Sequence, residues 1–305
     1  MKIAFIGGVK FSHELLSTIL SNGWDVSVVF SYEDSKKKYY SDIASFTNLT
    51  ERYGIKHIQV DNINDPYNIK VLKESNPDLI LVMGWSQLLT NEIIKIPRLG
   101  VIGSHPTELP KYRGRAPLPW TIIKNLHESA LTFFYIAEGV DNGDILDQRK
   151  FSISQNDDAS SLYTTMTNLG KQMILDNLVI LKDGKAIRKK QQESQFIENW
   201  PKRTSEDGEI NWNTSSKEIH TLIRATTHPY PGAFTKFKNE KLIIWKSEIL
   251  NCIDSDPGIL KEINSDNVVV GTGDGVLKIL QASYQDKDEL NKIFSITDIG
   301  FRLGL

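Results

Sequence analysis

The stretch “PDLILVMG” (77–84), with “LGVIGSH” (99–105) after it, decides the fold of this chain. Both runs are apolar almost throughout, which is typical of strands buried on both faces of a parallel sheet. Upstream, “KIAFIGG” (2–8) and “WDVSVVF” (24–30) have the same character, and apolar residues recur at helical spacing over 11–20 between them. The first part of the chain therefore alternates buried strands with helices.

The same alternation continues between these runs. A helix is expected over 42–54, a short strand over 56–60, and a helix over 65–76 that opens with Asp65 as its cap. Strand–helix–strand units of this kind form parallel sheets. The pattern therefore predicts an α/β fold for the N-terminal domain, with a doubly wound, mainly parallel, Rossmann-like sheet.

Two groups of polar residues follow predicted strands directly. Gly84–Gln87 and Gly103–His105 both fall at the carboxyl ends of strands, where sheets of this class bind their ligands. The glycine pair Gly7–Gly8 lacks the G-x-G-x-x-G fingerprint, and no phosphate-binding loop motif is present. A nicotinamide cofactor is therefore not expected.

Beyond the strand at 99–105, the pattern changes from parallel units to a hairpin. Residues 130–153 read as two strands around “AEGVDNGD” (137–144). A long amphipathic helix is expected over 159–182, capped by Asp157 or Asp158.

The last third of the chain has a different composition. Residues 191–210 are polar and turn-rich and read as a linker, 215–228 as a helix, and short strands predominate from Gly232 onward. We therefore expect an N-terminal domain over 1–190 and a smaller, β-rich, barrel-like C-terminal domain over 211–305.

Composition excludes several classes of protein. With 36 basic and 38 acidic residues, the net charge of −2 gives no general attraction to nucleic acid or to an anionic membrane. No run approaches the ~20 apolar residues that span a bilayer. The single cysteine, Cys252, allows no intrachain disulfide and is expected to be buried and unreactive, which favours a cytoplasmic location. No pattern of His, Cys and acidic residues has metal-ligand spacing, so no metal site is expected.

His105 is the residue most suggestive of chemistry. A lone histidine at a strand end is more often structural than catalytic. Here, however, two prolines stiffen the loop that follows, and Arg113 and Arg115 place positive charge beside it. Asp141, on the glycine-flanked turn of the hairpin, supplies a carboxylate that could orient the imidazole.

The segment “SHPTELPKYRGRAPLPW” (104–120), followed by “EGVDNGDIL” (138–146), closely resembles the folate-dependent formyltransferase family. That family includes methionyl-tRNA formyltransferase and enzymes that N-formylate nucleotide-linked amino sugars. Its pattern is Asn-x-His, a Ser-Leu-Leu-Pro-like segment, a basic Arg-Gly loop and a downstream Asp-x-Gly turn. The resemblance extends to 200–212, 222–235 and 268–279, and so to nearly the whole chain.

The resemblance implies that an acceptor amine attacks the formyl carbon of 10-formyltetrahydrofolate, with no metal. By similarity, His105 is the acid/base and Asp141 hydrogen-bonds it. The family places an oxyanion-stabilising Asn where this chain has Gly103, which has no side chain to donate. Gln87 at the neighbouring strand end, or a water held beside Gly103, is the expected substitute; Gln87 could equally line the folate pocket.

The resemblance also implies a set of folate contacts on two loops and one basic residue. They are Gln87, Leu88, Leu89, Arg115, Ala137, Glu138, Gly139, Val140 and Asp141.

The acceptor is less clearly indicated. A tRNA enzyme should cluster basic residues on one face, yet the lysine run 36–38 is bracketed by acidic residues. A nucleotide-linked amino sugar needs an aromatic for the base, which Tyr230, Trp120 or Phe234 could supply, and one or two cations for the diphosphate. We therefore expect small-molecule partners, folate and a nucleotide-linked amino sugar, with methionyl-tRNA as the alternative acceptor and a homodimer as one expected assembly. The departure at Gly103 leaves a third alternative, an inactive folate-binding protein.

Overall fold

The computed structural model describes most of the chain. The described residues are 1–33, 41–192, 197–251, 256–284 and 290–304. Two features singled out above, the lysine run 36–38 and Cys252, lie outside the described residues.

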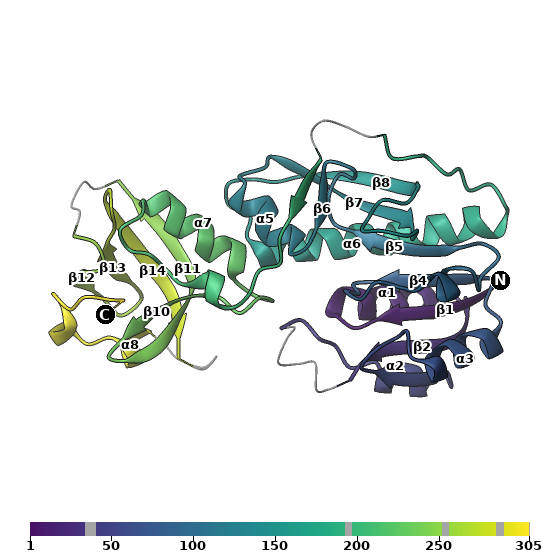
Figure 1. Cartoon of the computed structure of the whole chain (residues 1–305). Helices are drawn as coiled ribbons and strands as arrows, with labels where there is room; N and C mark the ends of the chain where they lie inside the picture. The colour runs from purple at the N-terminus through teal and green to yellow at the C-terminus, as the bar shows by residue number, and fades with distance from the viewer. Residues whose placement is uncertain (34–40, 193–196, 252–255, 285–289, 305) are drawn as a thin grey trace. The chain divides into compact units, whose positions relative to one another are not determined.

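The chain divides into two compact units (Figure 1). The N-terminal unit comprises Met1–Pro117, His127–Ile153 and Tyr163–Pro201, and the C-terminal unit comprises Leu118–Leu126, Ser154–Leu162 and Lys202–Leu305. The predicted linker 191–210 is thus divided after Pro201, with its first part in the N-terminal unit.

A seven-stranded sheet forms the centre of the N-terminal unit, in the order β3-β2-β1-β4-β5-β7-β8. Its strands are β1 (Lys2–Gly7), β2 (Asp25–Tyr32), β3 (Lys56–Val60), β4 (Leu79–Met83), β5 (Val101–His105), β7 (Glu128–Tyr135) and β8 (Ile145–Ser152). The first five strands of this order are parallel, while β7 pairs antiparallel with β5, and β8 with β7. Residues 79–83 of β4 are all buried, as their apolar sequence predicts. The predicted α/β, mainly parallel sheet is confirmed.

The helices of the first half match the apolar pattern with one correction. They are α1 (Lys10–Ser21), α2 (Thr47–Arg52), α3 (Pro66–Ser75) and the short α4 (Asn91–Ile94). The helix expected over 42–54 begins only at Thr47, because the backbone of 42–44 bonds elsewhere: Lys10 donates to the Asp42 carbonyl and Ala44 to the Gly8 carbonyl. Helix α3 begins after Asp65 as predicted, but the Asp65 carboxylate makes no cap bond to the helix.

The long helix α6 (Ala159–Lys182) has the predicted bounds. Asp158 caps it, since its Oδ1 accepts the Ser161 N–H at 2.9 Å, and Asp157 accepts the Ser161 hydroxyl at 2.8 Å. Helix α5 (Pro117–Ile123) was not expected from the sequence.

Strand β6 (Tyr112–Gly114) pairs in parallel with β9 (Glu198–Trp200), and neither strand was expected. Gly114 is required at this contact, because a Cβ there would lie 2.3 Å from the Trp200 carbonyl oxygen. Arg115 N–H donates to the same oxygen at 2.9 Å, and the rings of Tyr112 and Trp200 stack with centroids 4.7 Å apart. Part of the predicted linker is therefore a strand that holds the basic loop.

Gly103 in β5 is tightly covered by the neighbouring chain. A Cβ on Gly103 would lie 3.0 Å from Ile136 Cγ1, 3.1 Å from Ile136 Cδ1 and 3.3 Å from Phe134 Cε1. Ile136 is fixed there because its N–H donates to the Val101 carbonyl at 2.8 Å. Hydrocarbon thus bounds the position that a Cβ on Gly103 would occupy, so a larger side chain fits there only if Ile136 moves.

The C-terminal unit contains an antiparallel five-stranded sheet, in the order β10-β11-β14-β13-β12. Its strands are β10 (Ala233–Phe237), β11 (Glu240–Leu250), β12 (Leu260–Ile263), β13 (Val268–Gly271) and β14 (Val276–Ser283), and it also holds α7 (Ser216–Thr226) and the short α8 (Leu290–Ile293). Helix α7 starts at a capping box formed by Ser215 and Glu218. The predicted β-rich C-terminal domain is confirmed as an antiparallel sheet.

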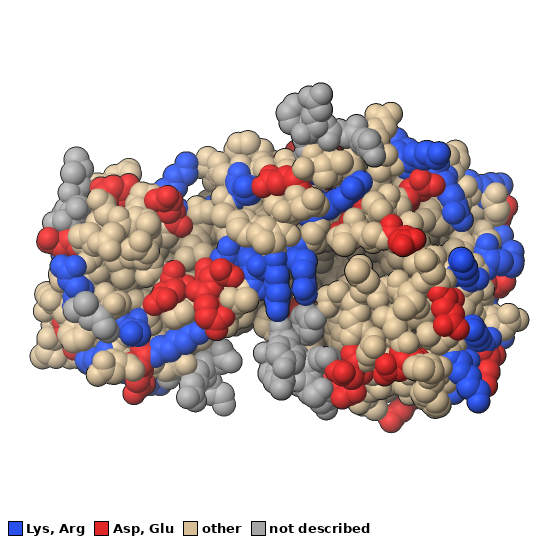
Figure 2. Space-filling view, in the orientation of Figure 1, with Lys and Arg blue, Asp and Glu red and all other residues tan. Residues whose placement is uncertain are grey.

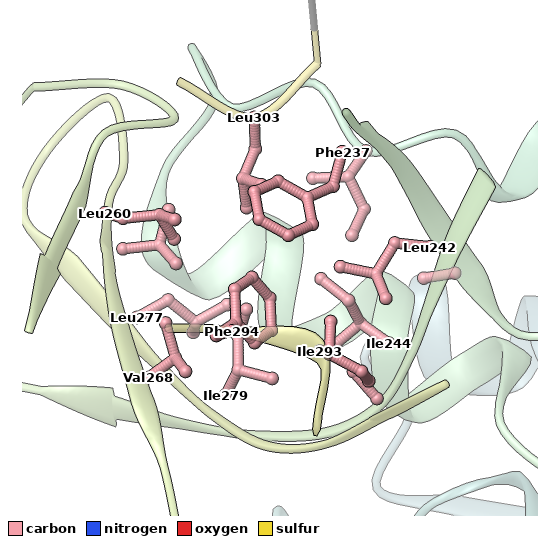
Figure 3. Packing of buried hydrophobic residues seen from close by; sticks show 14 of the residues in the cluster. Phe237, Leu242, Ile244, Leu260, Val268, Leu277, Ile279, Ile293, Phe294 and Leu303 are labelled. Carbon is pink, nitrogen blue, oxygen red and sulfur yellow. The ribbon is translucent and has the colours of Figure 1, made fainter. Parts of the chain in front are cut away.

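One apolar cluster forms the core of this sheet (Figure 3). Side chains from the strands meet residues of the C-terminal segment there, with the rings of Phe237 and Phe294 4.9 Å apart. Across the described ranges, no helix combines the length and the apolar character needed to cross a membrane.

The packing around Gly103 generates a stability prediction. Gly103→Ala forces its methyl group against Ile136 and should lower the free energy of unfolding by about 1–3 kcal/mol. Ile136→Ala removes both contacting atoms, so the double variant should lose less than the sum of the single losses. Urea unfolding of the four proteins of this cycle measures the coupling. Strictly additive losses would show that Ile136 does not restrict residue 103.

His220 of α7 generates a pH prediction. Its Nδ1 lies 2.9 Å from the Ser247 hydroxyl of β11, and burial, with Arg224 as a second cause, lowers the pKa of His220 to about 4. The unfolded chain therefore binds this proton below about pH 6.5, whereas the folded chain does so only near pH 4.

The free energy of unfolding should consequently decrease as the pH falls from about 6.5 to 4. His220→Gln cannot titrate and should show a shallower decrease over that window, measured by urea unfolding at several pH values. His127→Gln, whose side chain is exposed, is the control. An equal slope in wild type and His220→Gln would contradict this account.

Candidate active site

His105, the last residue of β5, is buried, with only 5% of its surface exposed. Its Nε2 lies 2.9 Å from the carbonyl oxygen of Tyr112. A carbonyl only accepts hydrogen bonds, so Nε2 carries a proton and donates it. The other ring nitrogen, Nδ1, lies 3.6 Å from Asp141 Oδ2, which is too long for a direct hydrogen bond but makes an ion pair when the ring is protonated. The structure thus brings together the two residues singled out from the sequence.

Asp141 is held on a strained turn between β7 and β8. Its φ of 49° lies in the left-handed region, which Asp adopts more readily than most residues with a side chain but which is still uncommon for it. Its carboxylate accepts the Gly114 N–H at 3.1 Å. Gly143 closes the turn, because a Cβ there would lie 1.7 Å from the Tyr135 carbonyl oxygen. The backbone of this turn therefore determines where the carboxylate points.

Thr107 is a site residue that the sequence did not single out. Its hydroxyl donates to the Tyr112 carbonyl at 2.5 Å, the same oxygen that His105 contacts. Its own carbonyl accepts the Thr132 hydroxyl at 2.6 Å. Thr107 thus fixes the acceptor that orients the imidazole. One feature of the sequence could have indicated Thr107: it stands at the Ser position of the Ser-Leu-Leu-Pro-like segment, so this chain also has a hydroxyl there.

Gln191 is a second residue that the sequence did not indicate. Its Nε2 donates to the carbonyl oxygens of Asp141 and Gly143, both at 2.8 Å. Its Oε1 accepts from Arg113 Nη2 at 2.8 Å. No local pattern marks this residue, which lies in the segment predicted as a linker.

Gln87 is placed differently from the expectation. Its Oε1 accepts the Ile63 N–H at 3.0 Å, and its Nε2 donates to the Asp61 carbonyl at 2.5 Å. The side chain therefore holds the loop after β3, and only its second amide proton lacks a partner among the described residues. No described contact joins Gln87 to His105.

Several of the predicted folate contacts are open to solvent. Leu88 is 63% and Val140 is 49% exposed. The Arg115 side chain and Ala137–Gly139 are exposed too, whereas Leu89 packs against the core of the sheet. The loops after β4 and β7 thus present apolar groups, backbone amides and one cation.

Two of the three aromatics proposed for a nucleotide base have a cationic side chain over the ring. Arg203 lies over the Trp120 ring, 5.0 Å from its centroid, and Lys241 lies 3.8 Å from the centroid of Phe234. Among the described residues there is also no group of three or more His, Cys, Asp or Glu side chains that could hold a metal ion.

Solved structures share the fold. HypX from Aquifex aeolicus in complex with tetrahydrofolic acid superposes with a TM-score of 0.71 at 20% identity, covering 96% of this chain and 46% of that chain. WlaRD, a sugar 3N-formyl transferase solved in the presence of dTDP and 5-N-formyl-THF, gives a TM-score of 0.66 at 24% identity, covering 94% and 99%.

Comparison with known sequences identifies the family of this chain. The methionyl-tRNA formyltransferase of Caldanaerobacter subterraneus subsp. tengcongensis is 33% identical over 287 residues, covering 92% of this chain and 91% of that protein. That of Ruminiclostridium cellulolyticum is 30% identical over 317 residues and covers both chains completely. Sequence models described as formyl transferase and as formyl transferase, C-terminal domain, match residues 1–178 and 202–292. The chain is therefore an enzyme that belongs to the formyl transferase family.

Proposed function

We propose that this enzyme transfers a formyl group from 10-formyltetrahydrofolate to a primary amine, with His105 and Asp141 at the reacting centre. The observation that carries the proposal is the buried imidazole at the end of β5 with a carboxylate 3.6 Å from its Nδ1. A histidine whose charge is balanced by a fixed carboxylate suits a reaction in which one nitrogen loses a proton and another gains one.

The proposed chemistry has three parts. The neutral amine attacks the formyl carbon, and the carbonyl π electrons move to the oxygen. His105 takes the proton that the attacking nitrogen loses, and Asp141 balances the imidazolium. The bond from the formyl carbon to the folate nitrogen then breaks as that nitrogen receives the proton. Gly103 cannot stabilise the oxyanion through a side chain, and the second amide proton of Gln87 is the donor we propose.

The folate donor fits the chemistry of the exposed loops. The apolar side chains of Leu88 and Val140 can cover the faces of its rings. The backbone of the turn 137–141 offers donors and acceptors to the ring edges. The exposed Arg115 suits the anionic part of the molecule. In this proposal turnover needs no metal, so chelation with EDTA should leave the rate unchanged.

Methionyl-tRNA is the acceptor that we propose first. The sequence pattern favoured a nucleotide-linked amino sugar, but relatives 30–33% identical over nearly the whole chain are methionyl-tRNA formyltransferases. The match to the C-terminal domain of the family over residues 202–292 agrees with such full-length relatives.

A nucleotide-linked amino sugar is kept as the second candidate, because of the charge pattern. Figure 2 shows one contiguous group of Lys and Arg side chains with a group of Asp and Glu side chains beside it, and elsewhere on the visible face the two kinds are interspersed. That distribution suits a small dianionic ligand better than an extended polyanion. An inactive folate-binding protein is disfavoured by the intact His105–Asp141 pair. A cytoplasmic location and a homodimer stay predictions.

The first functional prediction concerns the catalytic pair. His105→Asn should reduce kcat by roughly 10²–10⁴-fold, the usual contribution of a positioned acid/base. Asp141→Asn should also reduce kcat, because an amide balances no positive charge. Formyl transfer from 10-formyltetrahydrofolate measures both variants, and circular dichroism checks their folding. Wild-type rates in folded variants would remove His105 and Asp141 from the mechanism.

The second prediction separates the acceptors. If methionyl-tRNA is the acceptor, its affinity should fall by orders of magnitude from about 50 to 200 mM salt, since many phosphate contacts are lost. A nucleotide-linked amino sugar has only a diphosphate, so its KM should rise modestly, and free nucleoside diphosphate should compete with it. The assay compares methionyl-tRNA with dTDP-, UDP- and GDP-amino sugars. Efficient transfer to a sugar and none to methionyl-tRNA would reverse our order.

A further inference from the structure

The side chain of Gln191 joins two parts of the candidate site, the turn that carries Asp141 and strand β6. Its amide group donates both of its protons to the Asp141 turn, at the carbonyl oxygens of residues 141 and 143. Its oxygen accepts from Arg113 Nη2 in β6. One planar group therefore sets the separation between the turn that carries the carboxylate and the strand beside it.

The separation between this turn and β6 determines where the carboxylate of Asp141 lies. The same Oδ2 faces His105 Nδ1 at 3.6 Å and accepts the Gly114 N–H, which is the neighbour of Arg113 in β6. Because Asp141 has a positive φ, its backbone would relax toward a commoner conformation if the carbonyl contact were lost. The carboxylate would then turn away from the imidazole.

Gln191 is itself anchored close to this turn. Two residues before it, Lys189 exchanges both backbone hydrogen bonds with Ile145, the first residue of β8, at 2.9 and 2.7 Å. The side chain is partly buried, whereas that of the next residue, Gln192, is exposed. The amide is thus held in position by the sheet that also carries the Asp141 turn.

We propose that Gln191 is a positioning residue, which acts through Asp141 to hold the carboxylate against His105. This inference rests on the proposed function of that pair. Only an uncharged amide meets both demands on the side chain, since it donates twice to carbonyls and accepts once from a guanidinium. A carboxylate of the same size would keep the contact with Arg113 but would repel both carbonyl oxygens.

The test uses the full-length protein and a matched pair of variants. Gln191→Glu keeps the length and the Arg113 contact, and Gln192→Glu makes the same change at the exposed neighbour. We expect kcat of Gln191→Glu to fall about 10–100-fold, the cost of misplacing a catalytic group by about 1 Å, with the KM values for folate and acceptor within about twofold. Gln192→Glu should match wild type.

A second comparison distinguishes positioning from simple destabilisation. Asp141→Asn should lose activity, and adding Gln191→Glu to it should cause little further loss, because both changes act through one carboxylate. Losses that multiply, an unchanged kcat in Gln191→Glu, or an equal loss in Gln192→Glu would overturn the proposal.

A third measurement is independent of turnover. The Gly114 N–H, whose acceptor is Asp141, should exchange with deuterium roughly tenfold faster in Gln191→Glu than in wild type, as followed by NMR. Unchanged exchange would overturn the positioning role. If wild type transferred no formyl group to any acceptor, the proposed function would fail, while the exchange rates would still decide whether Gln191 holds Asp141.

Discussion

The parallel pairing of β6 with β9 is the interaction on which the rest of the candidate site depends. This pairing holds the loop after His105 in place. Two backbone groups of the paired strand, the Tyr112 carbonyl and the Gly114 N–H, then face the candidate site. The first accepts from the imidazole and the second donates to the Asp141 carboxylate. Both contacts are made by backbone groups, so the path of the chain orients the pair, together with the side chains of Thr107 and Gln191 that hold the backbone of the site.

This arrangement accounts for the stiff, basic loop. Gly114 has φ of 105° and no room for a Cβ beside Trp200, so the loop needs glycine where the strands meet. Arg113 points to Gln191, whereas Arg115 remains exposed. Two arginines that look equivalent in the sequence therefore have different surroundings, and only Arg115 is open to a ligand.

The departure from the family at Gly103 is compensated by packing. Where the family pattern has an Asn side chain, Ile136 and Phe134 close the space. In the proposed mechanism, the oxyanion is therefore stabilised by a group other than a side chain at residue 103.

Local sequence determined many of the strands and helices of this protein. Unbroken apolar runs at 77–84 and 99–105 give buried strands, and the α6 periodicity gives a helix with the predicted bounds. These features depend on neighbours within a few residues. The candidate site residues His105 and Asp141 were also indicated, first by their places at a strand end and on a glycine-flanked turn, and then by the resemblance of their motifs.

Only the tertiary structure decided the rest, because those features join segments far apart in the chain. No local periodicity in the sequence marks these contacts. They are the pairing of residues 112–114 with 198–200, the three hydrogen bonds of Gln191, and the hydrogen bonds between residues 42–44 and residues 8 and 10. Gln87 illustrates the same limit: its sequence position puts it at a strand end, but backbone groups of the next loop determine where its amide points. Local sequence determined most of the strands and helices of the two units, whereas long-range backbone hydrogen bonds and side-chain packing formed β6 and β9 and decided how the site is assembled.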